Sequence, residues 1–239
     1  MATVVVIGLG SFGCRVVQEL IEHKNADLII LDKDREIVEK YKSFALNAFI
    51  CDALNEETLG RIVPKDADAV VVDLSNSLET SILVTNHLKN IGIKQIIVKA
   101  KSDEHGNILK LVGASKIIYP DLDAAQNITP VIICKDLFSY IEISSNFAIA
   151  EVGLIKGFEN KTLLEISFRQ KFNLNVIGIK KDENAKIEIP KPNDILKENY
   201  ILVVAGTPDA IKNYSEKHRN INKDNSNKGF IFKMLSSKG

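Results

Sequence analysis

The apolar run Val4–Ile7 passes directly into the glycine pattern Gly8-Leu9-Gly10-Ser11-Phe12-Gly13, and helical spacing of apolar residues follows from Val16 to Leu20. This order predicts a strand, a tight turn and a helix. Gly8 permits the turn, Gly10 lets main-chain amides approach a pyrophosphate, and Gly13 allows the helix to pack closely on the strand. Because a helix N-terminus carries partial positive charge, this turn is a candidate phosphate site.

A second apolar run, Leu28–Leu31, ends in Asp32. In nucleotide-binding α/β proteins, a carboxylate about 20 residues after the glycine pattern accepts hydrogen bonds from the adenosine ribose. Asp32 occupies that place. A glycine pattern alone is also found in ordinary tight turns, but the turn, the spacing and the acid together predict a nucleotide ligand.

Composition excludes several classes of protein. The 31 basic and 31 acidic residues cancel to a formal net charge of +0, so no overall field attracts nucleic acid, and we expect no nucleic-acid partner. The three cysteines form no C-x-x-C pair, which argues against a zinc site or a disulfide framework. No apolar stretch approaches about 18 residues and no signal-peptide pattern is present, so we expect a cytoplasmic protein that neither crosses a membrane nor is secreted.

Short apolar runs alternate with helical patterns through the first half of the chain. This alternation predicts a Rossmann-type, doubly wound parallel sheet in an α/β domain of residues 1–138. The clearest helix runs from Leu78 to Ile91 and stops at Gly92, and a connector helix is expected from about Asp121 to Leu137, kinked or divided by Pro130. The expected strands are Val4–Ile7, Leu28–Leu31, Ala48–Ile50, Ala69–Val72, Gln95–Val98 and Lys116–Tyr119.

From Ser139 the pattern changes to short alternating segments, which predict a small α+β subdomain over residues 139–217. Its expected strands are Ala148–Ile155, Val176–Lys180 and Tyr200–Val204, with one helix near Thr162–Phe172 and a closing helix over Asp209–Lys217. Residues 218–239 are rich in lysine and polar residues and are expected to form a flexible basic tail.

Taken together, these residues resemble the RCK (regulator of potassium conductance) family of TrkA-N and TrkA-C domains, and especially the KtrA-type cytosolic subunits of Ktr and Trk potassium uptake systems. The resemblance covers Ala2 to about Lys212. It is carried by the glycine pattern with Phe12, and by Asp32-Lys33, Cys51-Asp52-Ala53, Ser75-Asn76, Val98-Lys99-Ala100, Gly113–Pro120, Leu163–Arg169 and Tyr200–Gly206.

The resemblance implies a regulatory protein that performs no reaction. It would bind ATP or ADP, with NAD(H) as an alternative, and assemble as homodimers into an octameric ring on a membrane potassium channel subunit of the KtrB or TrkH type, peripheral to the inner face of the cell membrane. By resemblance, the glycine loop cradles phosphates through Gly8, Gly10, Ser11, Phe12 and Gly13; Asp32 and Lys33 hold the ribose; Asp52 and Ala53 border the adenine; and Ser75, Asn76 and Lys99 lie near the phosphates. A helix cap is the alternative for Asp52.

Two positions depart from the family pattern. Ser11 stands where Ktr proteins often have an arginine that reaches the terminal phosphate, which leaves discrimination between ATP and ADP open. Asp121 stands where a glutamate is usual at a divalent cation between subunits, so Mg²⁺ or Ca²⁺ is the implied ion. Helix capping is the alternative for Asp121.

Many Ktr-type C-terminal subdomains bind cyclic di-AMP. By resemblance the corresponding residues are Leu163, Leu164, Arg169, Asn175 and Pro190. Arg169 would pair with a phosphate and the apolar residues would pack on adenine. The alternative is that both leucines are ordinary core residues and that Arg169 is a solvated helix charge.

The main rival function is an NAD-dependent oxidoreductase, because the glycine pattern with Asp32 also serves NAD enzymes. None of the four histidines, His23, His87, His105 and His218, lies in a recognisable acid/base constellation. A Rossmann-type transcription regulator is a third alternative, but no helix-turn-helix pattern supports it.

Overall fold

The computed structural model describes residues 1–23, 26–74 and 77–217. The described residues divide into two compact units, the first over Met1–Asp121 and the second from Leu122 onward. The connector helix α6 (Pro120–Ile133) therefore lies almost wholly in the second unit, whereas the sequence pattern places it in a first domain that ends at residue 138.

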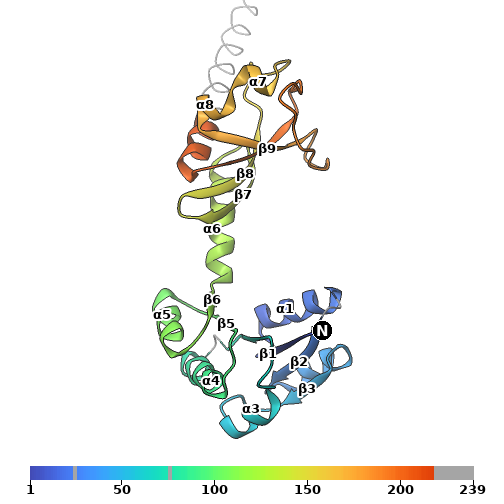
Figure 1. The fold of residues 1–239 in the computed structure, drawn as a ribbon, viewed down its shortest axis with the longest axis vertical. Helices are drawn as coiled ribbons and strands as arrows, with labels where there is room; N and C mark the ends of the chain where they lie inside the picture. Colours follow the sequence, from blue (N-terminus) through green and yellow to red (C-terminus); the bar gives the residue numbers. More distant parts are fainter. Residues whose placement is uncertain (24–25, 75–76, 218–239) are drawn as a thin grey trace, which may run out of the picture. The chain divides into compact units, whose positions relative to one another are not determined.

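The first unit is built on a six-stranded parallel sheet in the order β3-β2-β1-β4-β5-β6 (Figure 1). This is the doubly wound order expected for a Rossmann-type sheet, so the predicted fold class is confirmed. Each predicted strand is present, with ends that differ by no more than two residues. The strands are β1 (Ala2–Ile7), β2 (Ala26–Asp32), β3 (Asn47–Ile50), β4 (Ala69–Val72), β5 (Ile96–Lys99) and β6 (Lys116–Ile118).

Helices cover both faces of this sheet. Successive residues of its central strands point to opposite faces and are apolar, so both faces must be buried. In β1, Val5 and Ile7 belong to one buried cluster and Val6 to the other. Helices α1 (Ser11–His23) and α2 (Arg35–Tyr41) pack on the Val6 side, and α3 (Glu56–Ile62), α4 (Leu78–Ile91) and α5 (Asp103–Val112) pack on the other. A short 3₁₀ helix, η1 (Lys42–Phe44), follows α2.

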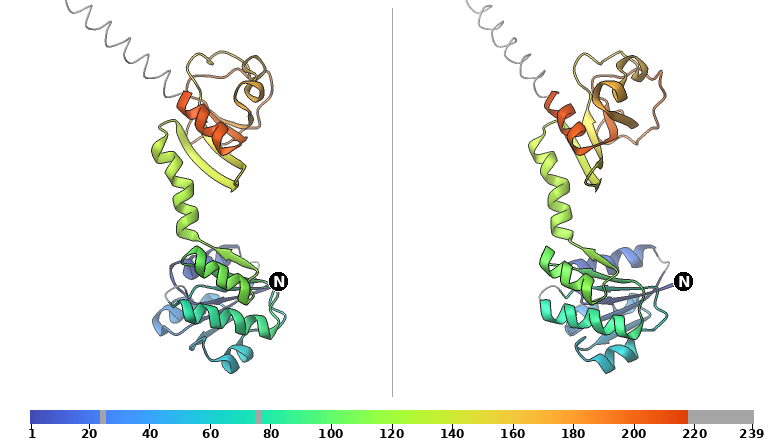
Figure 2. Two further views of the ribbon diagram at one scale, coloured as in Figure 1. Left: turned by 90° about the vertical axis from the view of Figure 1, so that its left-hand side faces the viewer. Right: turned by 60° about the vertical axis from the view of Figure 1, so that its left-hand side comes forward.

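The second unit is an antiparallel sheet in the order β7-β8-β10-β9, covered by short helices. The described residues 208–217 form the expected closing helix, drawn in red in Figure 2. Its Ile211 and Tyr214 pack into the core of this sheet. The elements are β7 (Leu137–Ser144), β8 (Phe147–Gly153), α7 (Leu163–Ile166), α8 (Phe168–Phe172), β9 (Leu174–Lys180) and β10 (Ile201–Gly206).

Two details of the second unit differ from the prediction. The connector helix ends at Ile133 and not at about Leu137 as expected. Leu137 is instead the first residue of the strand β7, which was not predicted. The single helix expected at Thr162–Phe172 is two helices, because Ser167 adopts a left-handed conformation with φ of 53°. That break lets Ile166 and Phe168 both enter the core.

Candidate functional site

The carboxyl ends of β1, β2 and β4 meet at one edge of the parallel sheet. The strand order reverses between β1 and β4, because β2 and β3 lie on one side of β1 and β4 to β6 lie on the other. Ligands bind at this point in open α/β sheets. A cavity of about 430 Å³ opens at this point. We call it the glycine-loop cavity; the residues that line it include Gly8, Gly10, Asp32, Lys33, Cys51, Asp52, Ala53, Asp73 and Thr80.

The glycine loop requires glycine at all three predicted positions. Gly8 has a φ of +86°, and a Cβ built on it would lie 2.3 Å from the main-chain oxygen of Asp73. A Cβ on Gly10 would lie 2.6 Å from Asp73 Oδ2, and one on Gly13 would lie 2.2 Å from the oxygen of Gly8. The close packing that the glycine pattern predicts is therefore present.

Asp32, at the end of β2, faces the cavity and is half-buried. Its Oδ2 accepts the main-chain N–H of Leu9 at 2.5 Å, and its Oδ1 accepts that of Asp34 at 2.9 Å. Since each carboxylate oxygen can accept more than one hydrogen bond, both remain able to accept ribose hydroxyls. Lys33 follows on the rim with an exposed side chain.

Asp52 and Ala53 form the wall of the cavity after β3. Ala53 is 5% exposed, and Asp52 is exposed with its Oδ1 accepting the N–H of Leu54 at 3.0 Å. The cap of α3 is Asn55, whose side chain accepts the N–H of Thr58. Helix capping, the alternative for Asp52, is therefore wrong, and its carboxylate lies at the cavity.

Four other predicted residues do not line this cavity. Ser11 is exposed in the first turn of α1, and Phe12 packs against the core on the α1 side of the sheet. The main-chain N–H of Gly13 donates to Asp73 Oδ2 at 2.9 Å, and Lys99 Nζ lies 3.6 Å from Asp73 Oδ1. The remaining two predicted residues, Ser75 and Asn76, lie outside the described residues.

Asp73 is the site residue that the sequence analysis missed. It follows β4 directly and is 7% exposed. A signal was available, because Asp73 follows the buried run Val70–Val72, just as Asp32 follows its own apolar run. Parallel strands bring such residues to the same edge of a sheet.

The Cys51 thiol lines the cavity and is not expected to act as a nucleophile. Burial raises the pKa of Cys51, which lines the cavity, and burial also raises the pKa of Cys14 in α1. Both thiols therefore stay protonated at neutral pH, and neither is a ready nucleophile.

A second cavity, of about 400 Å³, lies in the second unit, and all five residues predicted for cyclic di-AMP line it. We call it the C-terminal cavity. Leu163 and Leu164 come from α7, Arg169 from α8, Asn175 from β9 and Pro190 from the loop before β10. Leu163 packs partly on the core, whereas Leu164 is 65% exposed, so the core alternative is wrong for Leu164.

A capping box positions α7 at this cavity. Thr162 Oγ1 accepts the N–H of Glu165 at 3.2 Å, and Glu165 Oε2 accepts the N–H of Thr162 at 2.7 Å. The hydrogen bond from the Thr162 main chain is the main reason that the pKa of Glu165 lies below its usual value. The Glu165 carboxylate therefore serves to cap the N-terminus of α7.

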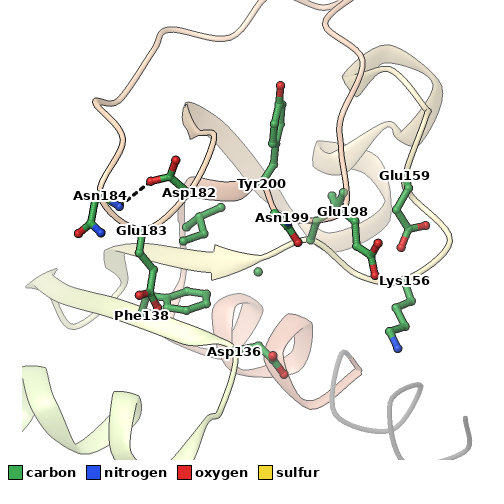
Figure 3. A pocket seen from close by; sticks show the side chains of 13 residues that line it. Asp136, Phe138, Lys156, Glu159, Asp182, Glu183, Asn184, Glu198, Asn199 and Tyr200 are labelled. Carbon is green, nitrogen blue, oxygen red and sulfur yellow. Dashed lines mark hydrogen bonds between the residues drawn. The ribbon is translucent and has the colours of Figure 1, made fainter.

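A third cavity, of about 650 Å³, also lies in the second unit and is acidic (Figure 3). Its lining sets a single lysine, Lys156, against five carboxylates: Asp136, Glu159, Asp182, Glu183 and Glu198. Such a lining repels anionic ligands, so this larger cavity is a poor site for a nucleotide.

Asp121 is exposed in the first turn of α6. Within the part of the chain that the structure describes, no group of three or more His, Cys, Asp or Glu could hold a metal ion. An ion at Asp121 would therefore need ligands other than a cluster of such side chains in the described part of one chain. None of the helices in the described ranges is long and apolar enough to span a bilayer.

Comparison with known proteins agrees with the geometry. Residues 4–120 match the TrkA-N domain and residues 151–218 match the TrkA-C domain. The chain is 29% identical over 212 residues to both Ktr system potassium uptake protein C and Ktr system potassium uptake protein A of Bacillus subtilis (strain 168), with 89% of this chain and 95% of each relative covered.

Solved structures show the same fold. The GsuK channel bound to NAD matches with a TM-score of 0.59 and 20% sequence identity, over 87% of this chain and 38% of the channel chain. This chain thus spans well under half of that channel. The family expected from the sequence is confirmed: the chain belongs to the RCK family, with a TrkA-N and a TrkA-C domain, and is related to the potassium uptake proteins of Ktr systems.

Proposed function

We propose that this protein is the regulatory subunit of a potassium uptake system and that its glycine-loop cavity binds an adenine nucleotide. ATP or ADP is the proposed ligand, with NAD(H) as the alternative. One observation carries the proposal. A single cavity, where the strand order reverses between β1 and β4, is lined by Gly8, Gly10, Asp32, Asp52 and Ala53 together. Its volume of about 430 Å³ is in the range of small-molecule sites.

Each part of a nucleotide has a chemical partner in this cavity. Asp32 offers carboxylate oxygens to ribose hydroxyls, and the small Ala53 leaves a flat apolar wall for adenine, with Asp52 able to accept from the exocyclic amine. The loop from Gly8 to Gly10 leads into the N-terminus of α1, where the helix dipole favours phosphate. Lys33 adds a positive charge on the rim.

The rival oxidoreductase finds less support. Among the described residues that line the cavity there is no histidine or tyrosine to move a proton, and burial raises the pKa of the Cys51 thiol. The two Bacillus subtilis relatives, which match over 95% of their length, are named for potassium uptake. A binding and gating role uses the cavity without requiring such groups.

The proposed partner is a membrane potassium channel subunit of the KtrB or TrkH type, approached by an octameric ring of homodimers. Exposed apolar residues support self-association. No residue of α6 is buried within its own chain, and Ile128, Ile132 and Ile133 are 51%, 76% and 66% exposed. Such a helix is expected to be covered by a second copy.

A divalent ion, Mg²⁺ or Ca²⁺, held by Asp121 from more than one subunit belongs to the same proposal.

Cyclic di-AMP is the proposed ligand of the C-terminal cavity. Arg169 is the charged residue of that lining, and apolar Leu163, Leu164 and Pro190 surround it. This chemistry suits an adenine ring beside a phosphate. A dinucleotide with two equal halves would use the cavities of two copies.

Regulation follows if a ligand binds two shapes of the dimer unequally. A difference of about 1.4 kcal/mol in binding free energy gives a tenfold shift in their ratio. The membrane partner would respond to that ratio.

Calorimetric titration with ATP, ADP, NADH and cyclic di-AMP, with the mass in solution measured alongside, tests this function. Tight binding of one adenine nucleotide by an oligomer, with independent binding of cyclic di-AMP, is the expected result. Preference for NADH by a monomer that ignores cyclic di-AMP would favour the oxidoreductase.

A further inference from the structure

The carboxylate of Asp73 lies directly beneath the glycine loop. Its Oδ2 accepts the main-chain N–H of Gly13 at 2.9 Å, and a Cβ built on Gly10 would lie 2.6 Å from the same oxygen. The residue is 7% exposed and also lines the glycine-loop cavity. A buried negative charge is therefore part of the phosphate end of this cavity.

The Gly13 amide belongs to the N-terminus of α1. It lies in the first turn of α1, where main-chain N–H groups have no partner within the helix. Such groups, with the positive end of the helix dipole, make the usual anion site of a nucleotide fold. In this chain the carboxylate of Asp73 already occupies that amide.

A lysine ammonium is paired with the same carboxylate. Lys99, at the end of β5, places its Nζ 3.6 Å from Asp73 Oδ1, and its side chain is 14% exposed. Lys99 and the Gly13 amide both contact Asp73 and lie outside the cavity lining, so a phosphate beside Gly10 would have neither of them as a direct partner. It would also meet the Asp73 charge at close range, which is unfavourable for like charges.

We propose that Asp73 determines the ligand specificity of the glycine-loop cavity by acting as an internal substitute for a phosphate at the N-terminus of α1. The cavity then holds the proposed ATP or ADP mainly through its adenosine part, at Asp32 and Ala53, and each phosphate contributes less to the affinity than it would beside an uncharged residue. This inference rests on the proposed nucleotide function. It concerns how strongly ATP binds relative to adenosine, which the charge of Asp73 sets.

The test compares Asp73→Asn with Asp68→Asn by calorimetric titration of adenosine and ATP. Asparagine keeps an oxygen that can accept the Gly13 N–H and removes the charge. Asp68 is a matched control, because its carboxylate also accepts a main-chain N–H, that of Thr3 at 2.7 Å, but at the opposite end of the sheet. Asp73→Ser is the second uncharged variant if Asp73→Asn does not fold.

The ratio of ATP affinity to adenosine affinity is expected to rise about tenfold in the Asp73 variants and to stay at the wild-type value in Asp68→Asn. An unchanged or lower ratio, with adenosine still bound, would overturn the role of Asp73 and leave the nucleotide site standing. If neither compound binds to any of the proteins, the nucleotide site itself is refuted, and the role of Asp73 with it.

Discussion

The Leu9 amide donates a hydrogen bond of 2.5 Å to Asp32 Oδ2 across a separation of 23 residues in the sequence. The acid at the end of β2 thereby fixes the glycine loop that follows β1. The proposed ribose end and the proposed phosphate end of the cavity are thus joined by this hydrogen bond, and a change at Asp32 is expected to affect both.

Asp32→Asn is expected to weaken adenine-nucleotide binding by tenfold or more, because hydrogen bonds to a charged acceptor contribute about 1.5–3 kcal/mol. The asparagine oxygen can still accept the Leu9 N–H, so we expect the melting temperature to change little. Asp27→Asn, at the other end of the same strand, is the control and should bind as the wild type does. Equal affinity in the two variants, measured by calorimetry, would remove Asp32 from the site.

The first unit could be predicted because its local signals agree with its tertiary structure. Helix α4 begins and ends where the sequence indicates: Ser77 accepts the N–H of Thr80 as the N-cap, and Gly92 ends the helix with a φ of +100°. The strands were found because the central ones are apolar on both faces and each is followed by a glycine or a polar residue.

The remaining features depend on contacts between segments that are far apart in the sequence. Leu137 was assigned to a helix, yet it pairs with Val152 as the first residue of β7. The left-handed Ser167 is required by the burial of its neighbours on both sides. Asp73 joined the site only when β4 was placed beside β1, which makes its carboxylate meet Gly13 from 60 residues away.

Gly13→Ala and Gly60→Ala are expected to have opposite effects on stability. A Cβ on Gly13 would lie 2.2 Å from the main-chain oxygen of Gly8, and overpacking of this kind costs about 2 kcal/mol. Gly60 lies inside α3 with nothing within 4 Å of its would-be Cβ, so alanine there should stabilise by up to about 1 kcal/mol. Urea unfolding measures both. Equal effects would mean that the loop is not closely packed.

His105 is expected to make stability depend on pH. Its Nδ1 accepts the N–H of Lys101 at 3.2 Å, so the proton is on Nε2, which lies 2.7 Å from Ser81 Oγ on α4. Burial lowers the pKa of His105 below its usual 6.5, so the folded state binds fewer protons than the unfolded state. Stability is therefore complete above about pH 6.5 and falls as the pH drops toward the lowered pKa.

The measurement is the free energy of unfolding at about pH 7.5 and about pH 5.5 for the wild type and for His105→Asn. The variant should lose about 2 kcal/mol at the higher pH, because a buried hydrogen-bonded ring is removed, and should show a smaller further loss at the lower pH. A pH dependence identical to that of the wild type would show that His105 does not titrate in this range.

Arg169→Gln is expected to weaken cyclic di-AMP binding by tenfold or more without affecting the affinity for adenine nucleotides, because the charged partner of a phosphate is lost. Lys171→Gln is the matched control. Lys171 lies on the same helix, but its Nζ stacks over the ring of Phe158 at 4.7 Å and does not line the C-terminal cavity. Titration of both variants decides the matter. If both weaken binding equally, the effect is one of general charge and the cavity is not the site.

Ile132→Asp is expected to split the oligomer. Ile132 is 76% exposed on α6, whose residues are all unburied within their own chain, so a second copy is the proposed cover. A buried carboxylate at the centre of such an interface would weaken association by tenfold or more. Ile189, which is 87% exposed in the loop before β10, gives the control Ile189→Asp, which should leave the mass unchanged. Light scattering over a range of protein concentrations separates the outcomes: a lower mass for Ile132→Asp alone supports α6 as the dimer contact, whereas an unchanged mass would mean that the copies associate through another surface.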